Sequence, residues 1–464
     1  MKFFDIFSLF SAFFVRGILA LCVLLAGLMP VQAGLIRDTE IERGLEALAW
    51  PMAEEAGLSS LRIRIVPDDS YNAFVIGGNT VYVHTGLLTK ARSAPEILGV
   101  LAHEIGHLAA GHAPRRSEAI KDANLTTTLA TLAAAAVAAS GASGDAAMGV
   151  ALGGFDRANR NYLALSRQDE SVADEWALRL LAGQEISSAG MADFMRRIAG
   201  ERALPEIRQS DYYRSHPGAG ARLLVFEDHA RKHGQDSPGI SEADEALLAR
   251  IIAKIKAFTE APMQTIGEIE RAQNTTRTDA TSAHDWPHFS DNDNLYRLSI
   301  AHYRRGALPR AMDFITQLQA REPSDQYLQE FAGDILLSMN KIDEAIASYE
   351  QALTGHEAPL IEFGLGRAYL ARADQGAAAD YQNAVNAFSR AVKGEARWPG
   401  LQRQLAIALG RNGQLAEADL ALANEALLLR DTARAKQMAK RALSYDDISK
   451  ESRNYANDIL FSLQ

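Results

Sequence analysis

The C-terminal third of the chain repeats a pattern of small residues at a fixed interval. Ala345 follows Ala311 by 34 positions, and Ala418 follows Ala384 by the same interval. This is the period of the tetratricopeptide repeat, in which small residues lie where paired helices approach closely. One helix pair cannot bury its apolar face alone, so at least three such units must stack. The pattern predicts an all-α solenoid over residues 291–464, and an ordinary helical bundle is the alternative.

The part before the repeats reads as a mixed domain of helices and strands. The predicted elements are a helix at 40–56 and strands at 61–66, 72–76 and 79–84, with further helices after them. Together they predict an α+β domain over residues 34–233. A helical linker region is expected over residues 234–290, with one helix at 242–258.

The first 33 residues have the pattern of a secretory signal peptide. The basic residues Lys2 and Arg16 precede an apolar run at 17–29, and Val31-Gln32-Ala33 forms a small-residue cleavage site. An uncleaved membrane anchor is the alternative, because residues 3–15 are also apolar. The single cysteine, Cys22, lies in this leader, so the expected mature chain needs no disulfide in an oxidising compartment. We therefore expect the bacterial periplasm.

The charge of the chain argues against one class of partner. Its formal net charge is −10, and the sequence contains no strong basic stripe. Proteins that bind nucleic acid usually carry such a stripe, so we expect no nucleic-acid partner.

Residues 125–154 form an alanine-rich and nearly uncharged segment. One interpretation is a tightly packed helical hairpin in the core. The other interpretations are a mobile lid over a cleft and an element that touches the membrane.

The sequence His103-Glu104-Ile105-Gly106-His107 lies in an apolar-periodic segment at 96–112 that is predicted to be helical. Residues four apart share a helix face, so both imidazoles can reach one metal ion while Glu104 holds a water. This is the pattern of a zinc hydrolase that cuts amide bonds. The alternative is a surface helix with two solvated histidines. The apolar residues before the motif argue against it, because burying unpaired polar groups costs free energy.

A catalytic zinc needs a third protein ligand, and Glu170 is the candidate. Glu170 and Asp174 are four residues apart and share a helix face if the segment is helical. Glu170 can then bind the metal while Asp174 holds the second nitrogen of a ligand histidine. His112 does not fall in register with the three-histidine pattern of other zinc peptidases. An acidic, solvated helix face is the alternative for Glu170 and Asp174.

The two motifs together, H-E-x-x-H and Glu170-Ser171-Val172-Ala173-Asp174, resemble the Ste24/HtpX-like family of zinc metallopeptidases. Asn72-Ala73-Phe74 and Ser215-His216-Pro217, with Arg222 shortly after, also match that family. The leader and the repeats make the chain similar to periplasmic members that work in outer-membrane β-barrel assembly. The resemblance implies an α+β zincin-like metallopeptidase domain followed by the all-α tetratricopeptide-repeat solenoid.

The resemblance also implies roles for single residues. His103, His107 and Glu170 would bind one Zn²⁺, with Glu104 as general base and Asp174 supporting a ligand. His216 would lie near the metal, where it either stabilises the oxyanion or occupies the open coordination position and keeps the enzyme latent. Arg222 would support the active site. Without the resemblance, His216 reads as a turn residue before proline.

An extended substrate is expected to pair with the free edge of the strand at 79–84, a mode that favours unfolded chains. Its residues are Asn79, Thr80, Val81, Tyr82, Val83 and His84. The repeats are expected to dock clients or a partner and so raise their concentration at the metal. The resemblance implies stalled outer-membrane proteins as clients and the barrel-assembly machinery as partner, and peripheral membrane contact stays open. The alternatives are a chaperone or scaffold with a latent protease site and a membrane-embedded protease.

Overall fold

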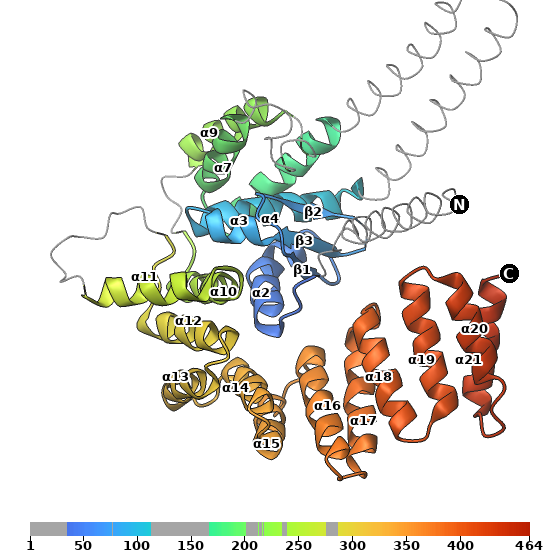
Figure 1. Cartoon of the computed structure of the whole chain (residues 1–464). Coiled ribbons are helices and arrows are strands. Elements are labelled where there is room, and N and C mark those ends of the chain that lie inside the picture. The colour runs from blue at the N-terminus through green and yellow to red at the C-terminus, as the bar shows by residue number, and fades with distance from the viewer. Residues whose placement is uncertain are drawn as a thin grey trace, which may run out of the picture.

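The computed structural model describes residues 35–76, 78–112, 167–200, 212, 216, 218–233, 239–274 and 286–464 (Figure 1). The predicted leader and segment 125–154 lie outside the described residues, as do Ser215 and Pro217. Among the helices that the structure describes, none is both long enough and apolar enough to cross a membrane.

The three predicted strands are confirmed and form one sheet. They are β1 (Arg62–Val66), β2 (Ala73–Val75) and β3 (Thr80–His84), in the order β1-β3-β2. β1 runs parallel to β3, with Arg62 opposite Thr80, and β2 runs antiparallel to β3. Ile63 and Val81 are fully buried while Arg62 is exposed. One face of the sheet therefore packs into the core, as the alternation of side chains requires.

β3 is the central strand, so the expectation that a substrate pairs with its free edge is wrong. β1 occupies one side of β3 and β2 occupies the other, and the backbone N–H of His84 also donates to the carbonyl of Asn72 at 3.0 Å. The backbone groups of β3 are therefore largely used within the sheet. An alternating apolar pattern shows which face of a strand is buried, but it does not distinguish a central strand from an edge strand.

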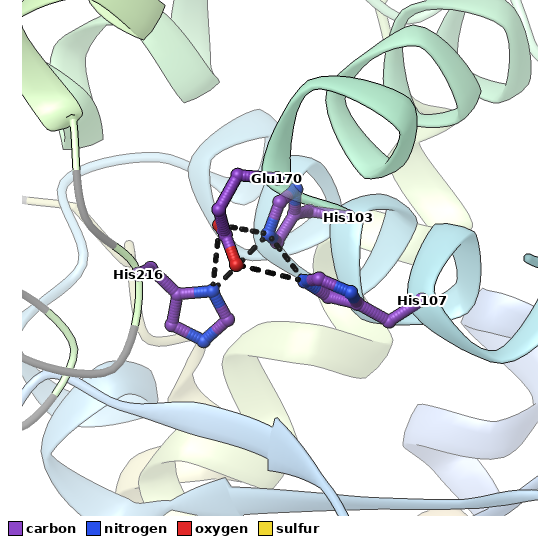
Figure 2. A group of neighbouring side chains, drawn as sticks. All are labelled: His103, His107, Glu170 and His216. Atoms are coloured by element: carbon purple, nitrogen blue, oxygen red, sulfur yellow. Dashed lines mark hydrogen bonds and ion pairs between the residues drawn. The ribbon is translucent and has the colours of Figure 1, made fainter. Parts of the chain in front are cut away.

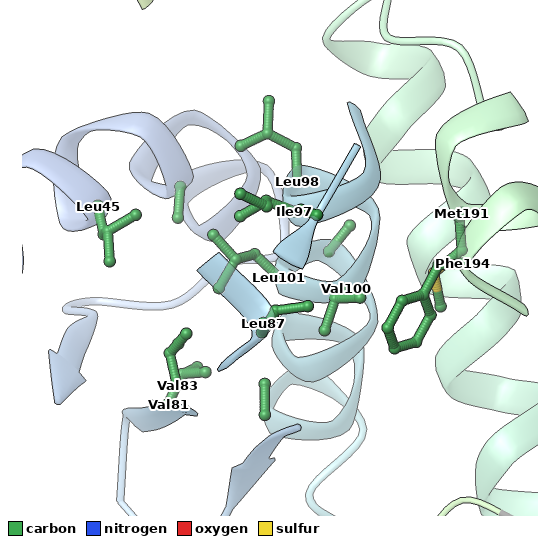
Figure 3. Close-up of a cluster of buried hydrophobic side chains, with 14 of the residues drawn as sticks. Leu45, Val81, Val83, Leu87, Ile97, Leu98, Val100, Leu101, Met191 and Phe194 are labelled. Carbon is green, nitrogen blue, oxygen red and sulfur yellow. The ribbon is translucent and has the colours of Figure 1, made fainter. Parts of the chain in front are cut away.

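Helices cover this sheet and complete the N-terminal core. The described helices are α2 (Thr39–Glu55), α3 (Thr85–Lys90), α4 (Ala94–Ala109), the helical residues 167–183, α7 (Ala189–Gly200) and α9 (Ala219–His233). Figure 3 shows Leu45 of α2, Val81 of β3 and Leu101 of α4 gathered around one buried cluster, with Phe194 of α7 on the far side of α4. α4 is therefore packed on both sides, which fixes the position of the residues it carries.

α10 (Glu242–Thr259) confirms the predicted helix at 242–258 and contacts both parts of the chain, and α11 (Pro262–Asn274) follows it. Ile251 and Ile252 belong to the N-terminal core, whereas Ala257 packs with the first repeat helices. The ammonium of Lys254 lies 2.7 Å from the carboxylate of Asp38 and 2.9 Å from that of Glu40. This region is therefore a packed connection between the two parts. The predicted domain boundaries remain predictions.

The C-terminal part is a curved solenoid of paired helices (Figure 1). Its helices are α12 (Asp291–Arg304), α13 (Leu308–Arg321), α14 (Gln326–Ser338), α15 (Ile342–Ala352), α16 (Pro359–Asp374), α17 (Asp380–Gly394), α18 (Pro399–Arg411), α19 (Leu415–Leu428), α20 (Thr432–Ala442) and α21 (Lys450–Ser462). The recurring alanines at 311, 345, 384 and 418 are all buried. The predicted fold class, an α+β peptidase domain followed by an all-α repeat solenoid, is confirmed.

Tyr349 of α15 shows why the repeats need small residues. A Cβ added at Gly333 of α14 would lie 2.9 Å from the Tyr349 ring, and one added at Gly364 of α16 would lie 2.7 Å from it. The Tyr349 hydroxyl donates to Asp334 at 2.6 Å, so the ring cannot easily move away. Two glycines thus allow one aromatic ring to fill the space between three helices.

We predict that Gly364→Ala lowers the stability of the solenoid by about 1–3 kcal/mol, because the added methyl group overpacks against a fixed ring. Gly410→Ala is the matched control. Its added Cβ would lie 3.9 Å from its nearest neighbour, so the better helix propensity of alanine should leave stability unchanged or raise it by up to about 1 kcal/mol. Denaturant unfolding measures both. Equal stability of the two variants would contradict the packing argument.

Candidate metal centre

Two helices that approach each other closely carry the predicted ligands. α4 carries His103, Glu104 and His107, and the helical residues 167–183 carry Glu170. The closest approach is at Gly106, where an added Cβ would lie 2.7 Å from the carbonyl oxygen of Ala173. A larger residue there would push the two helices apart. Sequence reasoning treated Gly106 as an unconstrained position of the motif, although a glycine inside a helix, which costs about 0.5–1 kcal/mol, is a signal of close packing.

The structure brings the donor atoms of His103, His107, Glu170 and His216 within 4.8 Å of one another, and all four side chains are buried (Figure 2). His103 Nε2 lies 3.1 Å from His107 Nε2 and 3.3 Å from Glu170 Oε2. His107 Nε2 lies 3.4 Å from Glu170 Oε1. Zinc bonds of about 2.0–2.1 Å in a tetrahedron place the ligand atoms roughly 3.3–3.5 Å apart. The three predicted ligands therefore fit a tetrahedral zinc ion.

His216 lies at the fourth position of this cluster. Its Nδ1 lies 2.9 Å from Glu170 Oε2 and 3.3 Å from His103 Nε2, and its Nε2 lies 3.6 Å from Glu104 Oε1. The ring of Tyr212 stacks on His216 with 4.3 Å between the ring centroids. The backbone N–H of His216 donates to the carbonyl of Tyr212 at 2.8 Å. A buried histidine thus faces the metal position, and Tyr212 holds its ring.

Asp174 and Arg222 form hydrogen bonds with the candidate ligands and hold them in orientation. Asp174 Oδ1 lies 3.0 Å from His103 Nδ1, the nitrogen that faces away from the cluster. The Arg222 guanidinium donates twice to Asp174 and once to Glu170, each at 2.7 Å. Such forked, charge-assisted hydrogen bonds fix both carboxylates in orientation. The structure therefore places both residues where the sequence analysis expected supporting groups.

The sequence analysis did not predict that His112 contacts the second ring nitrogen of His107. His112 Nδ1 lies 2.8 Å from His107 Nδ1, and His112 Nε2 lies 3.5 Å from Asp169 Oδ1. α4 ends two residues before Gly111, whose φ of 65° turns the chain so that His112 folds back against the helix. His112 was considered only as a ligand. The signal that could have found it is a glycine just before a histidine at a helix end.

Burial and the surrounding charges set unequal pKa values within the cluster. Burial and Arg222 lower the pKa of His103, but hydrogen bonds to Asp174 and Glu170 outweigh them and raise it to about 9. Burial lowers the pKa of His216 to about 4 and that of His107 well below its usual value. Burial alone would raise the pKa of Glu170, yet the histidines around it hold that pKa well below the usual range.

The predicted substrate strand is close to this centre in sequence but contributes none of the clustered donors. Val81, Val83 and His84 of this strand are buried, and the Nδ1 of His84 interacts with the Ser70 hydroxyl at 2.8 Å. The strand at 79–84 therefore supplies none of the candidate metal ligands among the described residues.

A buried set of two histidines and a glutamate, with a second glutamate beside them, defines a metalloendopeptidase. Residues 36–229 match the sequence model of Peptidase family M48. The Beta-barrel assembly-enhancing protease of Escherichia coli (strain K12) is 23% identical over 349 residues, which cover 73% of this chain and 67% of the relative. Metalloprotease LoiP of the same organism is 24% identical and covers 42% of this chain and 73% of the relative. A solved structure of YrrB, described as a TPR protein with an unusual peptide-binding site, is 18% identical with a TM-score of 0.29. It covers 43% of this chain and 93% of that chain.

We predict that Glu170→Gln weakens zinc binding at least about tenfold, because a neutral amide replaces a charged ligand. Glu175→Gln, on the exposed side of the same helix, is the matched control and should bind zinc like the wild type. Metal analysis after dialysis against a competing chelator gives the two affinities. Wild-type zinc affinity in Glu170→Gln would contradict the ligand assignment.

Zinc binding is predicted to release a proton at neutral pH. His103 is protonated below its pKa of about 9, and a histidine ligand must be neutral. The zinc affinity should therefore rise with pH up to about 9. His107 and His216 should release no comparable number of protons, because their pKa values are lowered. Calorimetry in buffers of different ionisation enthalpy counts the released protons. A zinc affinity that does not change between about pH 6 and pH 8 would contradict this account.

Proposed function

We propose that this protein is a periplasmic zinc-dependent endopeptidase that cuts misfolded or stalled outer-membrane proteins. The observation that carries the proposal is the buried cluster of His103, His107 and Glu170 with Glu104 on the same helix. The expected secretory leader and the names of the relatives, which include a Beta-barrel assembly-enhancing protease, support the compartment and the client class.

The residues suit hydrolysis of a peptide bond. A zinc ion held by His103, His107 and Glu170 would supply Lewis acidity and lower the pKa of a water molecule toward about 7. Glu104 is fully buried next to these ligands, so its carboxylate is placed to accept the proton of the attacking water and to pass it to the leaving amine. Asp174 holds His103 in the tautomer that leaves Nε2 free, and Arg222 keeps Asp174 and Glu170 in position.

His216 serves as a removable fourth ligand that keeps the site latent. Its Nδ1 faces the same point as the other donors, where a catalytic site needs an open position. This geometry favours the latent role over oxyanion stabilisation, because an oxyanion donor must leave that position free. Withdrawal of His216 from the cluster would open the site, and the stacked ring of Tyr212 opposes that movement.

An extended substrate pairs with the edge strand β2 and not with the central strand β3. β2 pairs with β3 on one side only within the described sheet, and it contacts α4, which carries the candidate ligands. A client in extended form can add a strand at such an edge through backbone hydrogen bonds. This mode requires an unfolded segment, which agrees with a role in the removal of misassembled proteins.

The repeats select the substrate by docking a client or a partner protein. A solenoid presents an extended surface, and a docked chain has a raised local concentration at the metal centre. The outer-membrane barrel-assembly machinery is the partner that fits the relatives' name. The second candidate function is a chaperone or scaffold with a latent protease site, which the position of His216 in the cluster favours.

We predict that Glu104→Gln abolishes cleavage of an unfolded outer-membrane protein, with a loss of about 10²–10⁴-fold, and still binds zinc. The loss follows because an amide cannot accept the proton. Glu175→Gln is the control for general effects of the substitution. Equal cleavage by Glu104→Gln and wild type would remove the peptidase assignment. Assisted barrel assembly by Glu104→Gln would favour the scaffold function.

We predict that His216→Ala raises cleavage of the same client several-fold, because the open coordination position no longer has to be vacated. His233→Ala, an exposed histidine at the end of α9, is the control. Initial rates at equal zinc content make the comparison. A lower rate would assign His216 a direct part in catalysis, and an unchanged rate would make it structural.

A further inference from the structure

A cavity of about 490 Å³ lies between the sheet of the peptidase domain and the turn that joins α17 to α18. Arg62 and Arg64 of β1 and Thr80 and Tyr82 of β3 form one wall, on the face of the sheet opposite the buried Ile63 and Val81. Residues 393–397, which are the C-terminal end of α17 and the turn after it, form the other wall. The cavity is therefore on a different face of the sheet from the apolar core.

Partly buried ion pairs hold the two walls together. Glu395 of the turn accepts hydrogen bonds from Arg37 and Arg64, both at 2.5 Å. Arg64 also pairs with Glu42 of α2. The Arg37 guanidinium lies over the ring of Trp398 at 4.9 Å from its centroid. Because both partners of Glu395 are fixed, the cavity is a preformed site with a defined shape.

The lining of this cavity has an excess of positive charge. Arg37, Arg62, Arg64, Lys393 and Arg397 line it, and Glu395 is the one acidic residue among the lining groups that the structure describes. Within the same described part of the chain, no ion pair joins Arg62, Lys393 or Arg397 to a carboxylate at 4.0 Å or less. The whole chain has a net charge of −10, so this concentration of cations runs against its average composition.

We propose that this cavity binds a phosphate-bearing ligand. A phosphate group carries about −1 charge as a diester and about −1.5 to −2 as a monoester, and it accepts forked hydrogen bonds from guanidinium groups. Arg62 donates to the carbonyl of Gly394 at 3.2 Å, but among the described residues none of the three cations outside the Glu395 ion pairs has an anionic partner, and a phosphate would supply one. The volume suits a small phosphorylated molecule or the headgroup of a lipid. Both sources present the same chemistry to Arg62, Lys393 and Arg397.

A phosphate bound in this cavity would bridge the peptidase domain and the solenoid. Arg62 belongs to the sheet, whereas Lys393 lies at the end of α17 and Arg397 lies in the turn that follows it. A phosphate that contacts all three adds attraction where these cations otherwise repel one another. The ligand therefore strengthens the contact between peptidase domain and solenoid.

The test is binding of two probes to the full-length zinc-loaded protein. Inorganic pyrophosphate, followed by calorimetry, represents a free phosphate ligand. Vesicles that contain phosphatidylglycerol, followed by co-sedimentation, represent a lipid headgroup, with vesicles of phosphatidylcholine as their neutral control. Arg397→Gln removes a cation that makes no hydrogen bond within the described residues, so the fold should survive. Arg453→Gln, an exposed arginine of α21, is the matched control.

At physiological ionic strength we expect at least one probe to bind, with affinity reduced at least about fivefold in Arg397→Gln and Arg62→Gln and unchanged in Arg453→Gln. Zinc content after each titration separates binding at the cavity from removal of the metal. Binding of pyrophosphate alone identifies a free phosphate ligand, and binding of vesicles alone identifies a lipid headgroup. The proposal would be overturned if neither probe binds, or if Arg453→Gln loses as much affinity as the cavity variants. It would also be overturned if an acidic peptide binds in place of either probe.

Discussion

The close approach of two helices at Gly106 is the contact on which the candidate site depends. The ligands come from segments more than sixty residues apart in the chain, and only tight packing brings Glu170 to the imidazoles of α4. α4 itself is held by a core on both sides, from β3 and α2 on one and from α7 on the other (Figure 3). The site is thus built on rigid elements, which is how a metal centre keeps its donors within a fraction of an ångström of the required positions.

Charge compensation is the second requirement. His103, Glu170, Asp174 and Arg222 are all buried, and an uncompensated buried charge would cost several kcal/mol. Each finds an opposite partner: Arg222 bridges the two carboxylates, and the carboxylates face the histidines. The same logic operates at the domain junction, where Glu395 joins Arg37 and Arg64. Buried ion pairs therefore hold the metal ligands, and partly buried ones hold the contact between the domains.

Local patterns predicted much of this architecture, and non-local packing accounts for what they missed. The i, i+4 spacing of His103 and His107 and the 34-residue period are periodic signals, so the helix face and the solenoid followed from the sequence. The order of the strands did not, because the same alternation of side chains fits an edge and a central position, and β3 proved central. The place of His112 depends on a left-handed turn at Gly111 that no spacing rule contains. That His216 reaches the fourth donor position depends on tertiary structure alone.

X-ray absorption spectroscopy of the zinc-loaded resting protein tests the central claim most directly. The account predicts four nitrogen or oxygen ligands at about 2.0–2.1 Å, with the multiple scattering of three imidazoles, from His103, His107 and His216. In His216→Ala, the same spectrum should show two imidazoles and an additional oxygen. A resting spectrum with a six-coordinate, all-oxygen environment, or one that His216→Ala leaves unchanged, would contradict the account.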